Sequence, residues 1–122
     1  MPARLRLDSL RAYLLSKKGA VEETPFGPDT LVFKVMGKMF ALLAWQEAPL
    51  RITLKCAPDD ALALRQQYPA VQPGYYMNKR HWNTITLDGS VPESELLAMI
   101  DDSYALVVRG LTKTLQKQLE EM

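Results

Sequence analysis

The sequence predicts an α+β fold of two layers, in which an antiparallel sheet carries its helices on one face. Two observations lead to this class. Short runs of strand-forming residues follow one another between positions 31 and 56, with turn signals between them. Elsewhere, apolar residues three or four positions apart predict amphipathic helices. The predicted order is helix, three strands, helix, two strands, helix, and consecutive hairpins favour an antiparallel sheet.

The N-terminal part is expected to form one helix and one hairpin. The helix is predicted over residues 9–17, with Asp8 as its N-cap. Residues 20–30 contain two prolines and a glycine, which predict a loop. Strands over residues 31–36 and 39–45 then flank a Gly-Lys dipeptide, the arrangement expected of a β-hairpin.

The middle of the chain is expected to add a strand, a helix and a second hairpin. A strand over residues 50–56 alternates apolar and polar side chains. Pro58 begins a helix that ends near residue 68, because a proline follows. An extended piece around residues 74–77, a polar turn and a strand over residues 81–88 form the second, looser hairpin.

The C-terminal part predicts the longest helix. Ser90 and Glu93 match a capping box that would begin it. Apolar residues recur at helical spacing from Leu96 to Val108, and Gly110 is expected to break or kink the helix. A last amphipathic segment follows the glycine.

Length and composition bound the class of protein. The chain has 122 residues, of which 48% are hydrophobic, so a single domain over residues 1–122 is expected. Lys and Arg number 15 against 14 acidic residues, and any affinity for polyanions must come from an uneven distribution of charge. The N-terminus does not resemble a signal peptide, and no apolar run approaches the roughly 20 residues of a membrane span. We expect a cytoplasmic protein.

No catalytic site is expected, and neither a metal nor a cofactor. One cysteine, Cys56, and one histidine, His81, exclude an internal disulfide and a single-chain zinc site of the usual spacing. Cys56 lies at an inward position of its strand, where a thiol is usually inert. Two acidic pairs, at positions 22–23 and 59–60, fit a loop and a helix start. The common nucleotide-binding and hydrolase motifs are absent from the sequence.

One face of the predicted sheet combines cations with hydroxyl groups. If alternate positions such as Phe33 and Ile52 point inward, the outward positions are Lys34, Arg51, Thr53, Lys55, Trp82, Thr84 and Thr86. The surface fits either an ordinary solvated sheet face or a site for an anion or a nucleic acid.

The segment 74–83 concentrates three aromatic residues, two cations and the only histidine of the chain. Cations can neutralise phosphates while flat rings pack on bases, which would suit a nucleic-acid contact. The alternative is that the aromatic residues cover the edge of the core and that the cations solvate the turn.

Several segments together resemble the MmcQ/YjbR family. They are residues 25–42, Leu54-Lys-Cys56, Tyr68-Pro69 and residues 73–89, and the most specific is Met-Asn-Lys-Arg-His-Trp-Asn-Thr at positions 77–84. The segment from Asp101 to Tyr104, followed by Val107, also resembles the C-terminal helix of the family. The resemblance implies a fold similar to the CyaY-like or secretion-chaperone-like folds. It also implies DNA binding through a "double wing" of two hairpins.

Our leading hypothesis is a DNA-binding module that uses hairpin tips and the open sheet face. Combining the resemblance with the residue patterns, the expected contacts are Lys34, Lys38, Arg51, Lys55, Lys79, Arg80, His81, Trp82 and Asn83. The alternative is a protein-interaction or chaperone-like module, monomeric or weakly dimeric, that docks a partner on the open sheet or on the stripe of Leu111, Leu115 and Leu119. An enzyme or a small-anion binder is a third interpretation.

Overall fold

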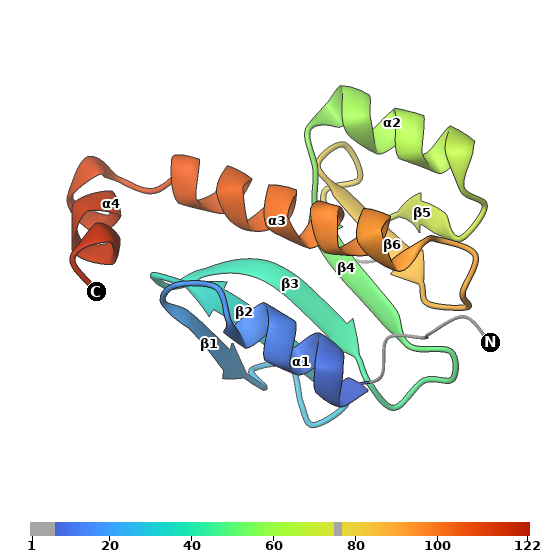
Figure 1. Ribbon diagram of the computed structural model, residues 1–122, viewed down its shortest axis with the longest axis horizontal. Helices are drawn as coiled ribbons and strands as arrows, with labels where there is room; N and C mark the ends of the chain where they lie inside the picture. Colours follow the sequence, from blue (N-terminus) through green and yellow to red (C-terminus); the bar gives the residue numbers. More distant parts are fainter. Residues whose placement is uncertain (1–6, 75–76) are drawn as a thin grey trace.

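The computed structural model describes residues 7–74 and 77–122, and it confirms the α+β class (Figure 1). Six strands of the described residues form one sheet in the order β1-β2-β3-β4-β6-β5, and all neighbours are antiparallel. The elements are α1 (Leu7–Leu15), β1 (Ala20–Glu23), β2 (Thr30–Val35), β3 (Lys38–Ala44), β4 (Arg51–Lys55), α2 (Pro58–Gln67), β5 (Val71–Pro73), β6 (Trp82–Thr86), α3 (Glu93–Arg109) and α4 (Lys113–Glu120).

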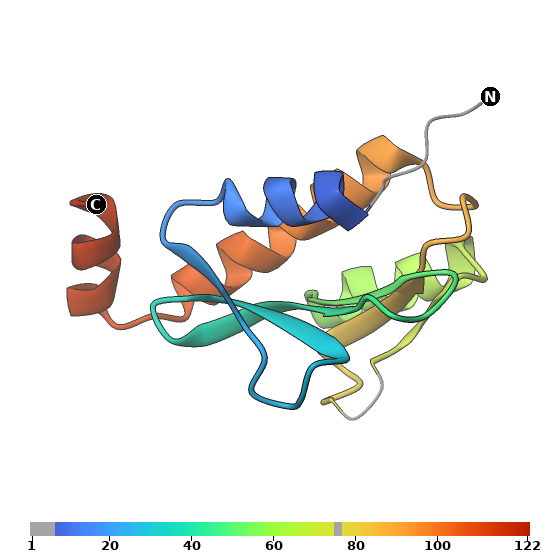
Figure 2. The same ribbon diagram turned by 90° about the horizontal axis from the view of Figure 1, so that it is seen from below.

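The helices cover one face of the sheet and bury the core against it. Figure 2 shows α1 and α3 lying along the same side of the strands. The core contains Phe33 and Ile52 from the sheet, Leu10 and Leu14 from α1, and Ile100 from α3, all essentially inaccessible to water. None of the described helices lies on the other face of the sheet, which leaves the loops at its edges to shape that surface (Figure 2).

The predicted first hairpin is confirmed, with its turn at Met36-Gly37 and not at the predicted Gly37-Lys38. The turn between β2 and β3 places Met36 at φ 50° and Gly37 at φ 83°. Two consecutive residues with positive φ are typical of the tight turns whose twist matches that of antiparallel strands. Lys38 therefore begins β3 at the tip of this hairpin, and its side chain is exposed.

The prediction of a loop over residues 20–30 is wrong in its first part, because Ala20–Glu23 forms the edge strand β1. This strand has only four residues, and Val21 is 47% exposed, so no apolar alternation marks it in the sequence. The first helix begins at Leu7, which places Asp8 within its first turn and not at the N-cap.

The predicted capping box is also wrong. Pro92 occupies the N-cap of α3, and no side chain caps the helix. Ser90 instead donates from its hydroxyl to Asp88 Oδ1 at 2.6 Å, and its backbone N–H donates to the same oxygen at 2.9 Å. The predicted break at Gly110 is confirmed, because α3 ends there and Thr112 caps α4 by accepting from the N–H of Leu115 at 3.2 Å.

The second hairpin exists with different bounds. Its first strand is Val71–Pro73, earlier than the predicted piece around residues 74–77, of which residues 75–76 lie outside the described residues. Its second strand, Trp82–Thr86, lies within the predicted range. Among the described residues, no helix combines the length and the apolar character needed to span a membrane.

Candidate nucleic-acid interface

The described part of the loop before β6, residues 77–81, presents two cations at its tip. Asn78 shapes the turn, because its side-chain oxygen accepts from the N–H of Arg80 at 2.9 Å and its carbonyl accepts from the N–H of His81 at 3.1 Å. Lys79 and Arg80 are exposed, and neither forms an ion pair with another described residue. The tip is therefore a compact cationic turn.

Arg65 on α2 anchors this turn from the helix side. Its Nε donates to Asn83 Oδ1 at 2.7 Å, and its guanidinium also donates to the carbonyls of Lys79 and Trp82. Asn83 in turn donates to the carbonyl of Ala61 at 3.3 Å. The donors of a planar guanidinium have a fixed geometry, so Arg65 loses little side-chain entropy for each hydrogen bond that it forms. It therefore holds these groups in a fixed arrangement.

Asn83 and Trp82 contribute to this anchorage and have little exposed surface. Asn83 is 2% exposed and points to the helix layer, opposite Leu54 in the register. Trp82 points to the open face but is only 9% exposed. The expectation of an accessible Trp82 ring is thus corrected, because its neighbours cover it. Trp82 and Asn83, the aromatic and amide residues of the motif at positions 77–84, therefore stabilise the base of the loop.

Gly74 closes the other side of the loop base. Its N–H donates to the carbonyl of Trp82 at 2.7 Å. A Cβ added to Gly74 would lie 2.8 Å from Trp82 Cβ, closer than real Cβ atoms approach, and 3.0 Å from the Trp82 backbone oxygen, which is a tight contact. Only glycine fits this contact without displacing the strand.

Two of the predicted cations on the open sheet face are neutralised. Lys34 Nζ lies 3.0 Å from Glu23 Oε1, and Arg51 Nε lies 2.9 Å from Glu47 Oε2. Lys34 belongs to β2 and its partner belongs to the adjacent edge strand β1. The sheet face is consequently less basic than the sequence alone indicates.

The same face contains a hollow of about 330 Å³ that the sequence did not reveal. It is lined by Thr30, Leu42, Ala44, Glu47, Arg51, Thr53 and Thr84. The hydroxyls of Thr53 and Thr84 lie 2.8 Å apart and hydrogen-bond to each other. Leu42 and Ala44 were not predicted to line a site on this face. A signal was present, because β3 has apolar residues at both alternating sets of positions, which indicates that both of its faces are partly covered.

Lys38 and Lys55 are the remaining predicted cations, and they lie where β3 and β4 diverge. The pairing of these two strands runs from Ala41–Leu54 to Ala44–Arg51. The turn that precedes Lys38 and the loop at residues 77–81 both leave the sheet at the Ala41–Leu54 end. Beyond it they extend apart from each other (Figure 1). The structure therefore does not gather the predicted cations into one patch.

His81 and Cys56 lie next to the paired ends of β6 and β4. The carbonyl of His81 accepts from the N–H of Cys56 at 2.7 Å. Burial, together with the carboxylates of Asp60 and Asp102, raises the pKa of the Cys56 thiol to about 11. At neutral pH this group is a thiol and not the reactive thiolate.

Comparison with known proteins decides the family. The YjbR family model matches residues 15–106 of the chain. The chain belongs to the YjbR family. The match includes the cationic turn with its anchors Arg65, Gly74 and Asn83, whereas α4 lies beyond it.

Relatives of this YjbR-family chain cover most of its length. It is 42% identical over 95 residues to YbdF of Escherichia coli O157:H7, which is 78% of each chain. It is 32% identical over 118 residues to YjbR of Escherichia coli strain K12, covering 97% of this chain and all of that protein.

Solved structures of similar proteins share the fold. The crystal structure of Deinococcus radiodurans DR2400 matches with a TM-score of 0.88 and 42% identity, over 93% of this chain and 87% of the other. A crystal structure of a Pseudomonas syringae protein matches with a TM-score of 0.72 and 29% identity, over 84% of this chain and 98% of the other.

Proposed function

We propose that this YjbR-family protein binds nucleic acid and that the cationic turn at residues 78–81 contacts the phosphates. The observation that carries the proposal is the pair Lys79 and Arg80, exposed on a turn that Arg65 holds in place. Neither cation is engaged by a carboxylate of the described residues. Phosphate contacts supply most of the affinity of sequence-independent binding, and a fixed turn lowers the entropy lost when they form.

The distribution of charge disfavours the approach of a polyanion over α2 and α3. Helices α2 and α3 together hold six of the 14 acidic residues but only two of the 15 Lys and Arg residues. The rest of the chain therefore has an excess of cations despite the formal net charge of +1. The negative charge of these two helices orients a polyanion away from their surface.

The ion pairs on the sheet face limit the contacts that this proposal uses. Lys34 and Arg51 already have carboxylate partners, so the phosphate contacts are assigned to Lys79 and Arg80, with Lys38 and Lys55 at the margins. With so few contacts we expect weak affinity without strong sequence preference, because phosphate contacts carry no sequence information.

A salt series tests this proposal. Fluorescence anisotropy of a labelled DNA duplex, and of a single strand of the same sequence, is measured against increasing protein at several NaCl concentrations. We expect binding at low salt that weakens steeply as salt rises. No binding of either DNA at low salt would exclude the proposal.

A second function, recognition of a protein partner, is favoured by the hollow on the open sheet face. Its lining combines threonine hydroxyls with Leu42 and Ala44, and the charged residues among its described lining form the Arg51–Glu47 pair. Such a mixed lining suits a peptide or protein surface better than phosphates. The substitution Thr53→Arg would fill the hollow. Suppose that the wild type captures a protein partner after nuclease treatment. Loss of that partner in the variant, with DNA binding retained, would support this function. Capture of the same partner by the variant would exclude it.

A further inference from the structure

A cleft of about 270 Å³ lies between α2 and α3, on the helix-covered side of the sheet. Helix α2 packs against β5, whereas α3 packs against β3 and β4 (Figure 1). The two helices therefore cover neighbouring parts of the sheet without closing the space between them. This cleft is on the opposite side of the sheet from the hollow described above.

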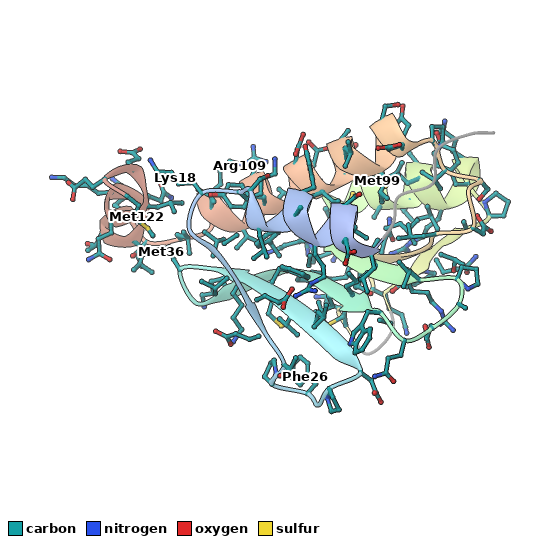
Figure 3. All side chains as sticks on the ribbon, turned by 60° about the horizontal axis from the view of Figure 1, so that its bottom comes forward. Lys18, Phe26, Met36, Met99, Arg109 and Met122 are labelled. Carbon is teal, nitrogen blue, oxygen red and sulfur yellow. The ribbon has the colours of Figure 1, made fainter. Side chains whose placement is uncertain are left out.

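The floor of the cleft is apolar. The sheet contributes Leu54 and Ile85, α2 contributes Leu64, and α3 contributes Met99, which Figure 3 labels. Ile85 is 1% exposed and Leu54 is 2% exposed, so the cleft reaches the level of the core. Apolar surface at the base of an open cleft favours an occupant that can cover it.

The rim of the cleft is acidic. It contains Asp60 from α2 and Glu95 and Asp102 from α3. Among the described lining residues the only cation is Lys55, which pairs in the sheet with Trp82 on the open face. None of these three carboxylates forms a hydrogen bond or an ion pair with another described residue. The neighbouring Asp101, in contrast, accepts from Tyr13 at 2.6 Å and pairs with Lys17. Two helices thus direct unpaired negative charge over one apolar floor.

We propose that this cleft binds a small organic cation, namely a primary amine or guanidinium on an apolar body. The apolar body covers Leu64, Ile85 and Met99, and the cationic group is placed among the rim carboxylates. Net negative charge of the rim disfavours an anion, and a neutral ligand would leave the carboxylates without a partner. The volume is close to the lower limit of roughly 300 Å³ for ligand pockets, which indicates a small molecule.

The test compares three probes of one shape and different charge. Phenethylamine, 2-phenylethanol and 3-phenylpropionate are titrated into the ¹⁵N-labelled full chain, and backbone and Asn83 side-chain amide shifts are followed by NMR. Asn83 lines the cleft and reports its occupancy. We expect the amine to shift the resonances around the cleft and to bind about tenfold more tightly than the alcohol, with the anion weakest.

Two variants and a matched control locate the binding site. Asp102→Asn removes a rim carboxylate and is expected to weaken amine binding about tenfold. Asp60→Asn removes the carboxylate on the other helix and provides the same test if the first variant is unstable. The control Asp59→Asn changes an exposed carboxylate outside the cleft and is expected to leave the amine affinity unchanged.

Three results would overturn the proposal. They are equal affinity of the alcohol and the amine, absence of amine-induced shifts in the cleft, and an equal loss of affinity in Asp59→Asn. None of these results bears on nucleic-acid binding, because the rim residues lie on α2 and α3 and not on the cationic turn.

Discussion

The hydroxyl of Ser103 on α3 accepts a hydrogen bond of 2.9 Å from the backbone N–H of Lys55 on β4. The same hydroxyl donates to the carbonyl of Phe40 on β3 at 2.6 Å. Ser103 is fully buried, and it lies where β3 and β4 stop pairing. A helix side chain thereby satisfies two strand groups that would otherwise lose their partners as the strands diverge.

Removing this hydroxyl should destabilise the protein. Ser103→Ala leaves a buried N–H and a buried carbonyl without a partner, and we expect the free energy of unfolding to fall by about 1–3 kcal/mol. Urea denaturation followed by circular dichroism measures it. The control Ser94→Ala changes an exposed serine of the same helix and should be neutral or slightly stabilising. Equal effects of the two substitutions would contradict the bridging role.

The loop base should not tolerate a side chain at residue 74. Gly74→Ala places a Cβ against the backbone of Trp82, and we expect a loss of about 1–3 kcal/mol of stability from the forced shift. Gly110→Ala is the matched control, because its added Cβ would have no neighbour closer than 3.5 Å. Thermal unfolding should separate the two variants, and a fully stable Gly74→Ala protein would show that the strand can move freely.

Arg65 should determine how firmly the cationic turn is held. Arg65→Lys keeps the charge but loses the planar fork that reaches Asn83 and the loop carbonyls, so we expect a loss of about 1–2 kcal/mol of stability. Hydrogen exchange at the Gly74 amide, which donates to Trp82, should accelerate. The control is Gln66→Ala, which changes the exposed neighbouring residue. The hydrogen-exchange rate of the Gly74 amide in this variant should match that of the wild type. Unchanged protection in Arg65→Lys would exclude the anchoring role.

The thiol of Cys56 should react slowly until the pH is high. Burial and the nearby Asp60 and Asp102 raise its pKa from 9.0 to about 11, so its thiolate fraction at pH 8 is about 100-fold smaller than that of an unperturbed thiol. Alkylation by iodoacetamide should therefore accelerate with pH up to about 11. Asp102→Asn should move this profile to lower pH. A rate that reaches its plateau near pH 9 in the folded protein would contradict the shift.

Local pattern was sufficient to predict most of the fold. The hairpin at Gly37 and the helix ending at Gly110 depend on residues close in sequence, and both are confirmed. The strand Ala20–Glu23 was missed because its identity depends on pairing with β2 and not on its own residues. Because this strand was missed, the ion pair between its residue Glu23 and Lys34 was missed as well.

The candidate site was harder to predict because its contacts connect distant segments. Alternation correctly places Trp82 on the open face, but it does not reveal that the ring is covered. The anchoring of Asn83 depends on Arg65, which belongs to a helix with no local sign of such a role. In the same way, the cleft between α2 and α3 exists only after both helices have packed on the sheet.

The salt dependence of DNA binding by a double variant tests whether Lys79 and Arg80 contact the phosphates. Lys79→Ala/Arg80→Ala removes two cations from the turn, while Lys113→Ala/Lys117→Ala removes two exposed cations from α4, the helix that Figure 3 shows beside Lys18 and Arg109 at the other end of the molecule. Both variants have the same net charge. We predict that the slope of log K against log salt falls in magnitude by about 1.8 for the turn variant and stays unchanged for the α4 variant. Equal slopes in the two variants, or a turn variant that binds like the wild type, would contradict it.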